Sequence, residues 1–234
     1  MKTLYYITFL AILSCSPQPK QVDKELLHSN IKQTDNSNSM YTLNDNEKQL
    51  CYNAKLSEED GLFLKKLTKR PIEILRFDRE FSKIEKPDAI GSWTTTPSEE
   101  NAIKIVLDNL DYFKKQGKYI FISEVGFKIG LTGVTSDPYK LMEYAETNGV
   151  NYNIETKDII EKYKKWDKEF GIIPIGIGFD FCECKIKNTK DIDFKKLANE
   201  VYEFCPDAVD QGTETVEALE EEIKRTGIIF LWWD

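Results

Sequence analysis

Apolar residues recur along this chain at the three- and four-residue spacing that is typical of helices with one buried face. The strongest stretch begins with Thr96 as N-cap, Pro97 at the first helical position and Glu99 at the third, which is the pattern of a capping box. Thr156 is the predicted N-cap of a further helix, which ends at Gly171. Helices are predicted at residues 57–70, 97–116, 156–170, 193–205 and 213–226.

Short apolar or alternating runs between the helices predict strands. They lie at residues 72–77, 118–127, 172–187 and 228–234. The run at 172–187 is either one long strand or a pair, with Gly176 and Gly178 at a bulge or a close backbone approach. Because helices and strands alternate, the predicted fold class is α/β or α+β, a single layered domain with helices packed on a mixed β-sheet.

Residues 126–139 contain Gly126, Gly130 and Gly133 and are predicted to form a turn or connecting loop. These glycines match neither the GxxxxGKS/T nor the GxGxxG phosphate-binding pattern. A nucleotide-binding loop is therefore not predicted here.

The first residues have the parts of a secretory signal, namely Lys2, an apolar run over residues 4–13 and a small residue before Cys15. Residues 12–15, Ile-Leu-Ser-Cys, resemble the lipobox of bacterial lipoproteins, in which the cysteine is acylated and becomes the first mature residue. The sequence thus predicts a lipoprotein signal peptide over residues 1–14 and lipidation of Cys15. The alternative is an ordinary cleaved signal followed by a chance cysteine.

Residues 15–46 are rich in Ser, Asn, Asp, Gln and Pro and lack apolar periodicity, so we expect a flexible tether there and a folded domain over residues 47–234. The predicted location is the cell envelope, lipid-anchored and facing the periplasm or the exterior. The lipid bilayer, reached through acylated Cys15, is a predicted partner. No later apolar run approaches the ~20 residues of a membrane-spanning helix.

Of the 234 residues, 41% are hydrophobic and 31% are charged, which suits a folded domain. The formal net charge of -8, with no Lys/Arg cluster, argues against nucleic acid as a partner. The single histidine, His28, falls in the predicted tether. Histidine-dependent catalytic triads and His-rich metal sites are therefore excluded from the domain, and no cofactor or metal is predicted.

The segment FCPDAVDQG at residues 204–212 joins two predicted helices. One interpretation is a well-formed turn, in which Pro206 ends a helix, Asp207 caps the turn and Gly212 takes a positive φ. This interpretation needs no chemistry to explain the residues.

The other interpretation places Asp207, Asp210 and Gln211 in a cleft as acid, base or polar binding groups. Two carboxylates ~5 to 9 Å apart would be typical of a glycoside hydrolase. The acids considered for such a site are Asp180, Glu183, Asp207, Asp210 and Asp234. The alternative is that these acids are simply solvated.

The chain ends Leu-Trp-Trp-Asp. On a strand, Trp232 and Trp233 point to opposite faces, so one belongs to the core and the other either packs under a helix or belongs to a binding surface. Asp234 adds a side-chain carboxylate to the terminal one, and this pair either binds a cation or is solvated. An exposed aromatic patch near Trp93, Trp232 or Trp233 would favour binding.

Cys182 and Cys184 lie two residues apart on one face of a predicted strand, and Cys51 and Cys205 lie elsewhere. An all-thiolate zinc site is disfavoured, because C-x-C is not the usual knuckle spacing. A disulfide from Cys205 to one of the others, or plain buried thiols, remain as alternatives.

A set of short motifs lies in the latter part of the chain: Ser136-Asp137-Pro138-Tyr139, Thr147-Asn148-Gly149-Val150-Asn151-Tyr152, Trp166, Phe179-Asp180, Ala198-Asn199-Glu200, Phe204-Cys205-Pro206-Asp207, Asp210-Gln211-Gly212 and Leu231-Trp232-Trp233-Asp234. With these residues the chain resembles a bacterial family known as domain of unknown function 4253, over about residues 135–234. The resemblance implies nearly nothing about activity, because the family is uncharacterised.

These observations favour a lipid-anchored, non-enzymatic binding or interaction module whose ligand is a protein or a small molecule. Gln211, Trp232, Trp233 and Asp234 are its candidate binding residues. The alternative is a carboxylate-based hydrolase that uses Asp207 and Asp210, with Asp180 as a further candidate.

Overall fold

The computed structural model describes residues 42–77, 88–95, 98–124 and 127–233. The predicted signal peptide, Cys15 and the predicted tether up to residue 41, with His28, lie outside the described residues. Thr96, Pro97 and Asp234 also lie outside them. The fold below is therefore that of the compact unit formed by the rest of the chain.

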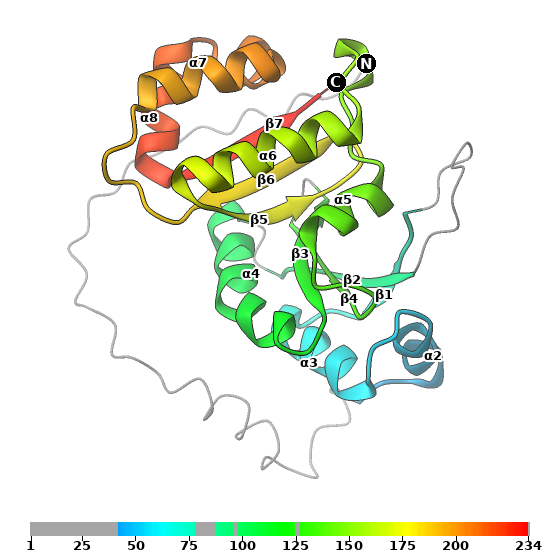
Figure 1. Ribbon diagram of the computed structural model, residues 1–234. Coiled ribbons are helices and arrows are strands. Elements are labelled where there is room, and N and C mark those ends of the chain that lie inside the picture. The colour runs from blue at the N-terminus through cyan, green and yellow to red at the C-terminus, as the bar shows by residue number, and fades with distance from the viewer. Residues whose placement is uncertain (1–41, 78–87, 96–97, 125–126, 234) are drawn as a thin grey trace, which may run out of the picture. The chain divides into compact units, whose positions relative to one another are not determined.

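One seven-stranded mixed sheet runs through the described residues, in the order β1-β2-β4-β3-β5-β6-β7 (Figure 1). β3 and β5 pair in parallel, and the other neighbouring strands pair antiparallel. The strands are β1 (Glu73–Leu75), β2 (Ala89–Trp93), β3 (Tyr119–Glu124), β4 (Lys128–Thr132), β5 (Ile172–Ile177), β6 (Phe181–Ile186) and β7 (Ile228–Trp232). The predicted fold class, helices packed on a mixed β-sheet, is confirmed.

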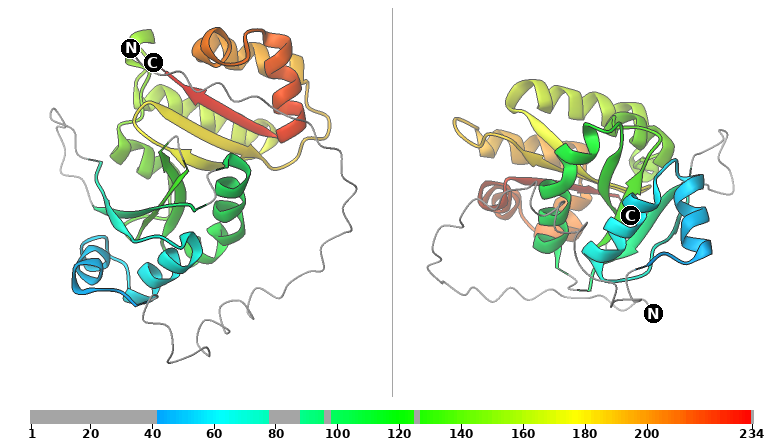
Figure 2. Two further views of the ribbon diagram at one scale, coloured as in Figure 1. Left: turned by 180° about the vertical axis from the view of Figure 1, so that it is seen from behind. Right: turned by 90° about the horizontal axis from the view of Figure 1, so that it is seen from below.

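Helices cover both faces of this sheet (Figure 1, Figure 2). Glu183 of β6 lies near Glu99 of α4, whereas the next residue, Cys184, lies near Tyr163 of α6. Since successive side chains of a strand point to opposite sides, α4 and α6 define two faces, here called the α4 face and the α6 face. The helices are α2 (Asp45–Asn53), α3 (Glu58–Thr68), α4 (Glu99–Lys114), α5 (Pro138–Ala145), α6 (Thr156–Phe170), α7 (Phe194–Phe204) and α8 (Val216–Thr226).

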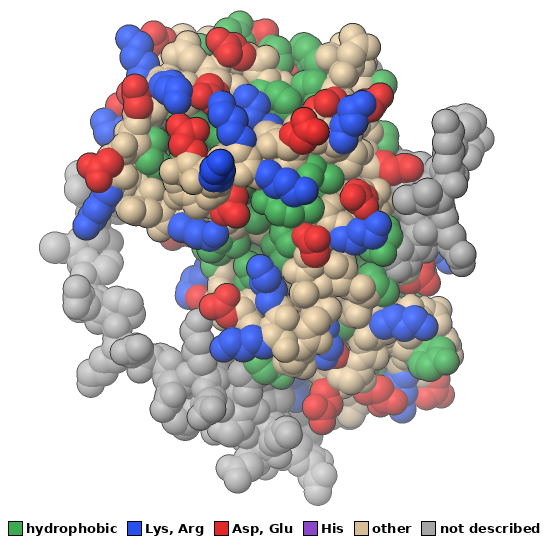
Figure 3. Space-filling model, viewed as in Figure 1, with side chains coloured by type: hydrophobic (Ala, Val, Ile, Leu, Met, Phe, Trp, Pro, Cys, Tyr) green, Lys and Arg blue, Asp and Glu red, His purple; other side chains and the backbone are tan. Residues whose placement is uncertain are grey.

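On the side seen in Figure 3, basic and acidic side chains are interspersed. The ion pairs of α6 residues include Lys165 with Glu200 and Asp167 with Lys187, both at 3.0 Å. Within the described residues, no helix combines the length and the apolarity needed to cross a membrane.

The N-cap of α4 differs from its prediction. The helix begins at Glu99, and the Oγ of Ser98 accepts a hydrogen bond from the backbone N–H of Asn101 at 3.2 Å. The prediction of Thr96 as N-cap is therefore wrong. The sequence Thr-Thr-Thr-Pro-Ser offers several hydroxyl groups, and capping chemistry alone does not choose among them.

The other predicted helix starts are close to those observed. Helix α3, predicted to start at Ser57, begins at Glu58 with Ser57 as its N-cap. Thr156 is the first residue of α6 rather than its cap, because Glu155 forms a capping box with Asp158 instead. Gly171 ends this helix with φ of 71°, in the left-handed region.

The described part of the predicted connecting loop, residues 127–139, does not form a loop. These residues contain β4, which lies between β2 and β3, and the start of α5, whose N-cap is Asp137. Gly130 makes room for a neighbouring ring, because a Cβ there would lie 2.6 Å from the Cζ of Phe121 on β3. The prediction is wrong because glycines in a central strand look like turn residues until the adjacent strand is known.

Residues 172–187 form a pair of antiparallel strands, β5 and β6. The register shifts between Pro174 and Gly176, so the bulge predicted at Gly176 is confirmed. In the turn that follows, the backbone N–H of Gly178 donates to the carbonyl oxygen of Phe181 at 3.0 Å. This tight connection places Asp180 at the end of the sheet.

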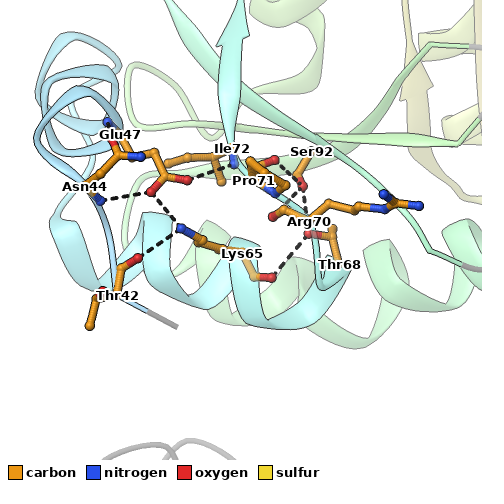
Figure 4. A network of polar contacts seen from close by, with 9 residues as sticks. All are labelled: Thr42, Asn44, Glu47, Lys65, Thr68, Arg70, Pro71, Ile72 and Ser92. Atoms are coloured by element: carbon orange, nitrogen blue, oxygen red, sulfur yellow. Dashed lines mark hydrogen bonds and ion pairs between the residues drawn. The ribbon is translucent and has the colours of Figure 1, made fainter. Parts of the chain in front are cut away.

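Helix α2 begins inside the segment predicted as tether and is fastened to the sheet by a buried polar network (Figure 4). Glu47, 3% exposed, accepts hydrogen bonds from the Lys65 ammonium at 2.7 Å, from the Asn44 N–H at 3.0 Å and from the Ile72 N–H at 3.4 Å. Burial by itself would raise the pKa of Glu47, but these hydrogen bonds lower it on balance.

Glu47→Gln is expected to lower the free energy of unfolding by about 1.5 to 3 kcal/mol at neutral pH, because it removes a hydrogen-bonded charge from a buried network. The difference between the variant and the wild type should shrink as the pH falls below 4.5. In this range the carboxylate of the folded wild type becomes protonated, and the wild type loses the stability that the ionised Glu47 contributes. Urea denaturation at pH 7 and pH 4 measures both effects. Glu59→Gln, at an exposed position of α3, is the control, and an equal loss in both variants would contradict the role of Glu47.

Candidate functional site

A hollow of about 490 Å³ lies at the end of the sheet where the parallel strands β3 and β5 both finish. Its apolar walls are the side chains of Phe179, Phe181, Phe230 and Trp232, and we call it the aromatic hollow. Phe181 and Trp232 are directly opposite each other in the β6–β7 pair, so both lie on the same face as Glu183, the α4 face. The rings of Phe181 and Phe230 are 6.1 Å apart, and Phe230 is 36% exposed. Aromatic surface is thus open to solvent.

The polar lining of the aromatic hollow comes from the ends of β3 and β5. Ser123 and Glu124 end β3, and Asp180 lies in the turn that follows β5. Glu124 accepts from the Lys128 ammonium at 3.1 Å. No lysine or arginine of the described residues forms an ion pair with the exposed Asp180 carboxylate. The hollow is therefore aromatic and acidic.

Trp232 and Trp233 point to opposite faces, as the strand pattern predicts. Trp232 lines the aromatic hollow, whereas Trp233 is 4% exposed and packs edge-on against Phe204 at 6.1 Å between ring centroids. A Cβ on Gly149 would lie 2.7 Å from the Trp233 ring. The loop that contains Gly149 reaches this ring because glycine has no side chain.

Asp207 is buried, 2% exposed, and accepts hydrogen bonds from neighbouring side chains. Its Oδ1 accepts from the Tyr152 hydroxyl at 2.6 Å and from the Gln211 amide at 2.8 Å. The hydrogen bond to Asp207 raises the pKa of Tyr152 to about 12. The phenol therefore keeps its proton at neutral pH and acts as a donor that orders the loop, not as a base.

The turn interpretation of residues 204–212 is confirmed in part. α7 ends at Phe204, before Pro206, as predicted. The next residues form a π-helical turn, η3 (Ala208–Thr213), which the Asp207 side chain does not cap. Gly212 does not take a positive φ; Glu214 does, at 67°. Both predicted roles are wrong because η3 closes by a backbone hydrogen bond from Glu214 to Val209.

The structure divides the acids that the sequence grouped together. Asp180 lies at the aromatic hollow with Trp232, and Asp207 lies in the buried cluster with Gln211. Asp210 is exposed and accepts from the Tyr202 hydroxyl at 3.1 Å. Asp234 is outside the described residues. Glu124, Phe181 and Phe230 belong to the hollow but had no sequence signal, since their grouping depends on the strand order.

The thiols of Cys51, Cys182, Cys184 and Cys205 are free and buried, which corresponds to the plain-thiol alternative. Burial raises the pKa of Cys205 to about 11, so its thiol is protonated at neutral pH and donates to the Trp232 carbonyl oxygen at 3.0 Å. In the described part of the chain, no three His, Cys, Asp or Glu side chains are grouped so that they could hold a metal ion.

Glu183 is a buried carboxyl next to the aromatic hollow. It lies directly opposite Phe230 in the β6–β7 register and is 3% exposed. Its Oε1 has no hydrogen-bond partner among the described residues. Burial, with a smaller contribution from the charge of Glu99, raises the pKa of Glu183 to about 8. The carboxyl is therefore mostly protonated at neutral pH.

The comparisons with known proteins bear on the C-terminal part of the chain. Residues 129–234 match the family model described as Domain of unknown function (DUF4253). The resemblance seen in the sequence is thus confirmed, with a match that starts at β4. Searches of curated proteins and of solved structures gave no match. The matched part includes Asp180 and the aromatic walls of the hollow, whereas Ser123 and Glu124 precede it.

The residues that carry this resemblance are far apart in sequence but meet in the fold. Tyr152 contacts Asp207, Gly149 lies under Trp233, and the backbone N–H of Trp233 donates to the Asp180 carbonyl oxygen at 2.9 Å. The shared motifs therefore hold the 147–154 loop, the η3 turn and the end of β7 together.

Glu183→Gln is expected to gain stability relative to the wild type as the pH rises from 4.5 through about 8. In this range the unfolded chain releases the Glu183 proton more readily than the folded one, so ionisation opposes folding in the wild type alone. The relative gain should be on the order of a few kcal/mol. Denaturation curves at pH 5, 7 and 9 measure it, with Glu161→Gln on the exposed side of α6 as the control. A difference that does not change with pH would show that the carboxyl is not buried as described.

Proposed function

We propose that this chain is a non-enzymatic binding module whose ligand occupies the aromatic hollow. The observation that carries the proposal is the group of four aromatic side chains around one open hollow. Its volume of about 490 Å³ lies within the roughly 300 to 1,000 Å³ of ligand pockets. An apolar surface that stays open to water, with a few polar groups at its rim, is typical of a recognition site.

A carboxylate-based hydrolase that uses Asp207 and Asp210 is the second candidate. The charges of both carboxylates raise the pKa of the Tyr152 phenol, so the two carboxylates are neighbours. Binding is preferred because Asp207 is buried and its Oδ1 already accepts two hydrogen bonds, which leaves it poorly placed to exchange a proton with a substrate. Turnover of a glycoside or an ester that Asp207→Asn abolishes would favour the hydrolase.

The proposal includes a place in the cell envelope. The lipobox-like residues 12–15 support acylation of Cys15, and stable anchoring would follow from several acyl chains, since one chain alone binds membranes only marginally. The described domain begins near residue 42, which leaves more than twenty residues of polar chain between the lipid and the hollow.

Phe230→Ala and Trp232→Ala test the binding site. Fragments that bind the full wild-type chain in a ligand-observed NMR screen should bind each variant at least tenfold more weakly, a loss of about 1.4 kcal/mol, because each variant removes one wall of the hollow. Tyr52→Ala is the control, since Tyr52 is an aromatic residue on α2 that is 71% exposed. Fragment affinities that remain equal in all three variants would refute the site, provided that circular dichroism shows each variant folded.

Cys15→Ser tests the anchor. The variant is expected to leave the membrane fraction of the producing bacterium and to lose incorporation of labelled palmitate, because the serine hydroxyl is not acylated by this route. Ser16→Ala, at the next position, should remain in the membrane fraction. Unchanged membrane retention of Cys15→Ser would exclude the lipobox interpretation.

A further inference from the structure

We infer that the aromatic hollow takes a small organic cation whose positive charge is carried among alkyl groups, as in a methylated ammonium. This inference rests on the proposed function of the hollow as a ligand site, and it names the chemical class of the ligand. Two features of the hollow support it. The charged side chains that line the hollow are acidic, and the rings of Phe181, Phe230 and Trp232 are not covered by a lysine or arginine of the described residues.

The charged side chains that line the hollow are acidic. Glu124 and Asp180 contribute carboxylates, and no lysine or arginine is among the lining residues. The Lys128 ammonium partly balances Glu124, but Lys128 also pairs with Glu73 at 2.6 Å and so neutralises neither acid completely. Asp180 is exposed at the rim. A cleft lined by charges of one sign concentrates ions of the opposite sign, here cations.

Two exposed aromatic rings outside the hollow are each covered by a lysine of this chain. Tyr52 and Trp93, which are 71% and 40% exposed, each have a lysine ammonium over the ring, at 5.8 Å and 5.4 Å from the centroid. Within the described residues, no lysine or arginine lies over Phe181, Phe230 or Trp232 in this way.

The faces of Phe230, which is 36% exposed, and of the half-buried Trp232 are therefore available to a cation from outside, with the buried Phe181 beneath them. A tryptophan face attracts a cation more strongly than the other aromatic side chains do, and Trp232 is at the wall nearest the end of β7. Alkyl groups around the charge would contact Phe181 and Phe230, while Asp180 would balance the charge. A neutral ligand of the same shape would keep the apolar contacts and lose the electrostatic ones.

Choline and its uncharged isostere 3,3-dimethylbutan-1-ol are a matched pair of probes. We expect choline to bind the full chain at least tenfold more tightly than the alcohol, measured by titration with tryptophan fluorescence and by NMR. Asp180→Asn should weaken choline binding about fivefold or more and leave the alcohol unchanged. Trp232→Phe should weaken choline binding, since the phenyl face attracts a cation less strongly. Glu161→Gln removes the same charge from the opposite face and should change neither affinity.

Equal affinity for choline and the alcohol would overturn the inference and leave the proposed binding function standing. Choline affinity that is unchanged in Asp180→Asn would overturn it as well. If the wild type shows no saturable response to choline, the ligand is not a cation of this class. The proposed function is judged separately by the fragment screen, so failure of one is distinguishable from failure of the other.

Discussion

The parallel pairing of β3 with β5 joins two antiparallel halves into one sheet, with β1, β2, β4 and β3 on one side and β5, β6 and β7 on the other. Parallel strands finish at the same edge of a sheet. Glu124 at the end of β3 therefore lies at the same edge as Asp180, which follows β5. Antiparallel pairing at this one position would send these groups to opposite ends, and the aromatic hollow would lose its polar lining.

The two tryptophans at the end of β7 lie on opposite faces of the sheet, because successive side chains of a strand alternate. Trp232 faces the open side and supplies a wall of the aromatic hollow, while Trp233 is buried and packs with Gly149 and Phe204. The buried Trp233 fixes the position of the strand end, and so it also holds the half-buried Trp232 in place. The hydrogen bond from the Tyr152 hydroxyl to Asp207 joins the 147–154 loop to the start of the η3 turn.

Three carboxyl groups show how surroundings decide what an acid can do. Asp207 is buried with hydrogen-bond donors and orders a loop. Glu183 is buried with an unpartnered oxygen, so burial raises its pKa and keeps it mostly neutral. Asp180 is exposed beside aromatic rings, where its carboxylate is accessible to a ligand. The sequence alone presents these groups as equivalent acids.

The sequence by itself determined the elements whose signals are local. The start of α3 at Ser57 and the apolar stripes of α6 and α8 depend on spacing within one segment, and so does the alternation of Trp232 and Trp233. Only the tertiary structure decided features that depend on a neighbour from elsewhere in the chain. Gly130 belongs to a strand because the Phe121 ring fills the space above it. The aromatic hollow exists because strand order, which no local pattern encodes, brings the ends of β3, β5 and β7 together.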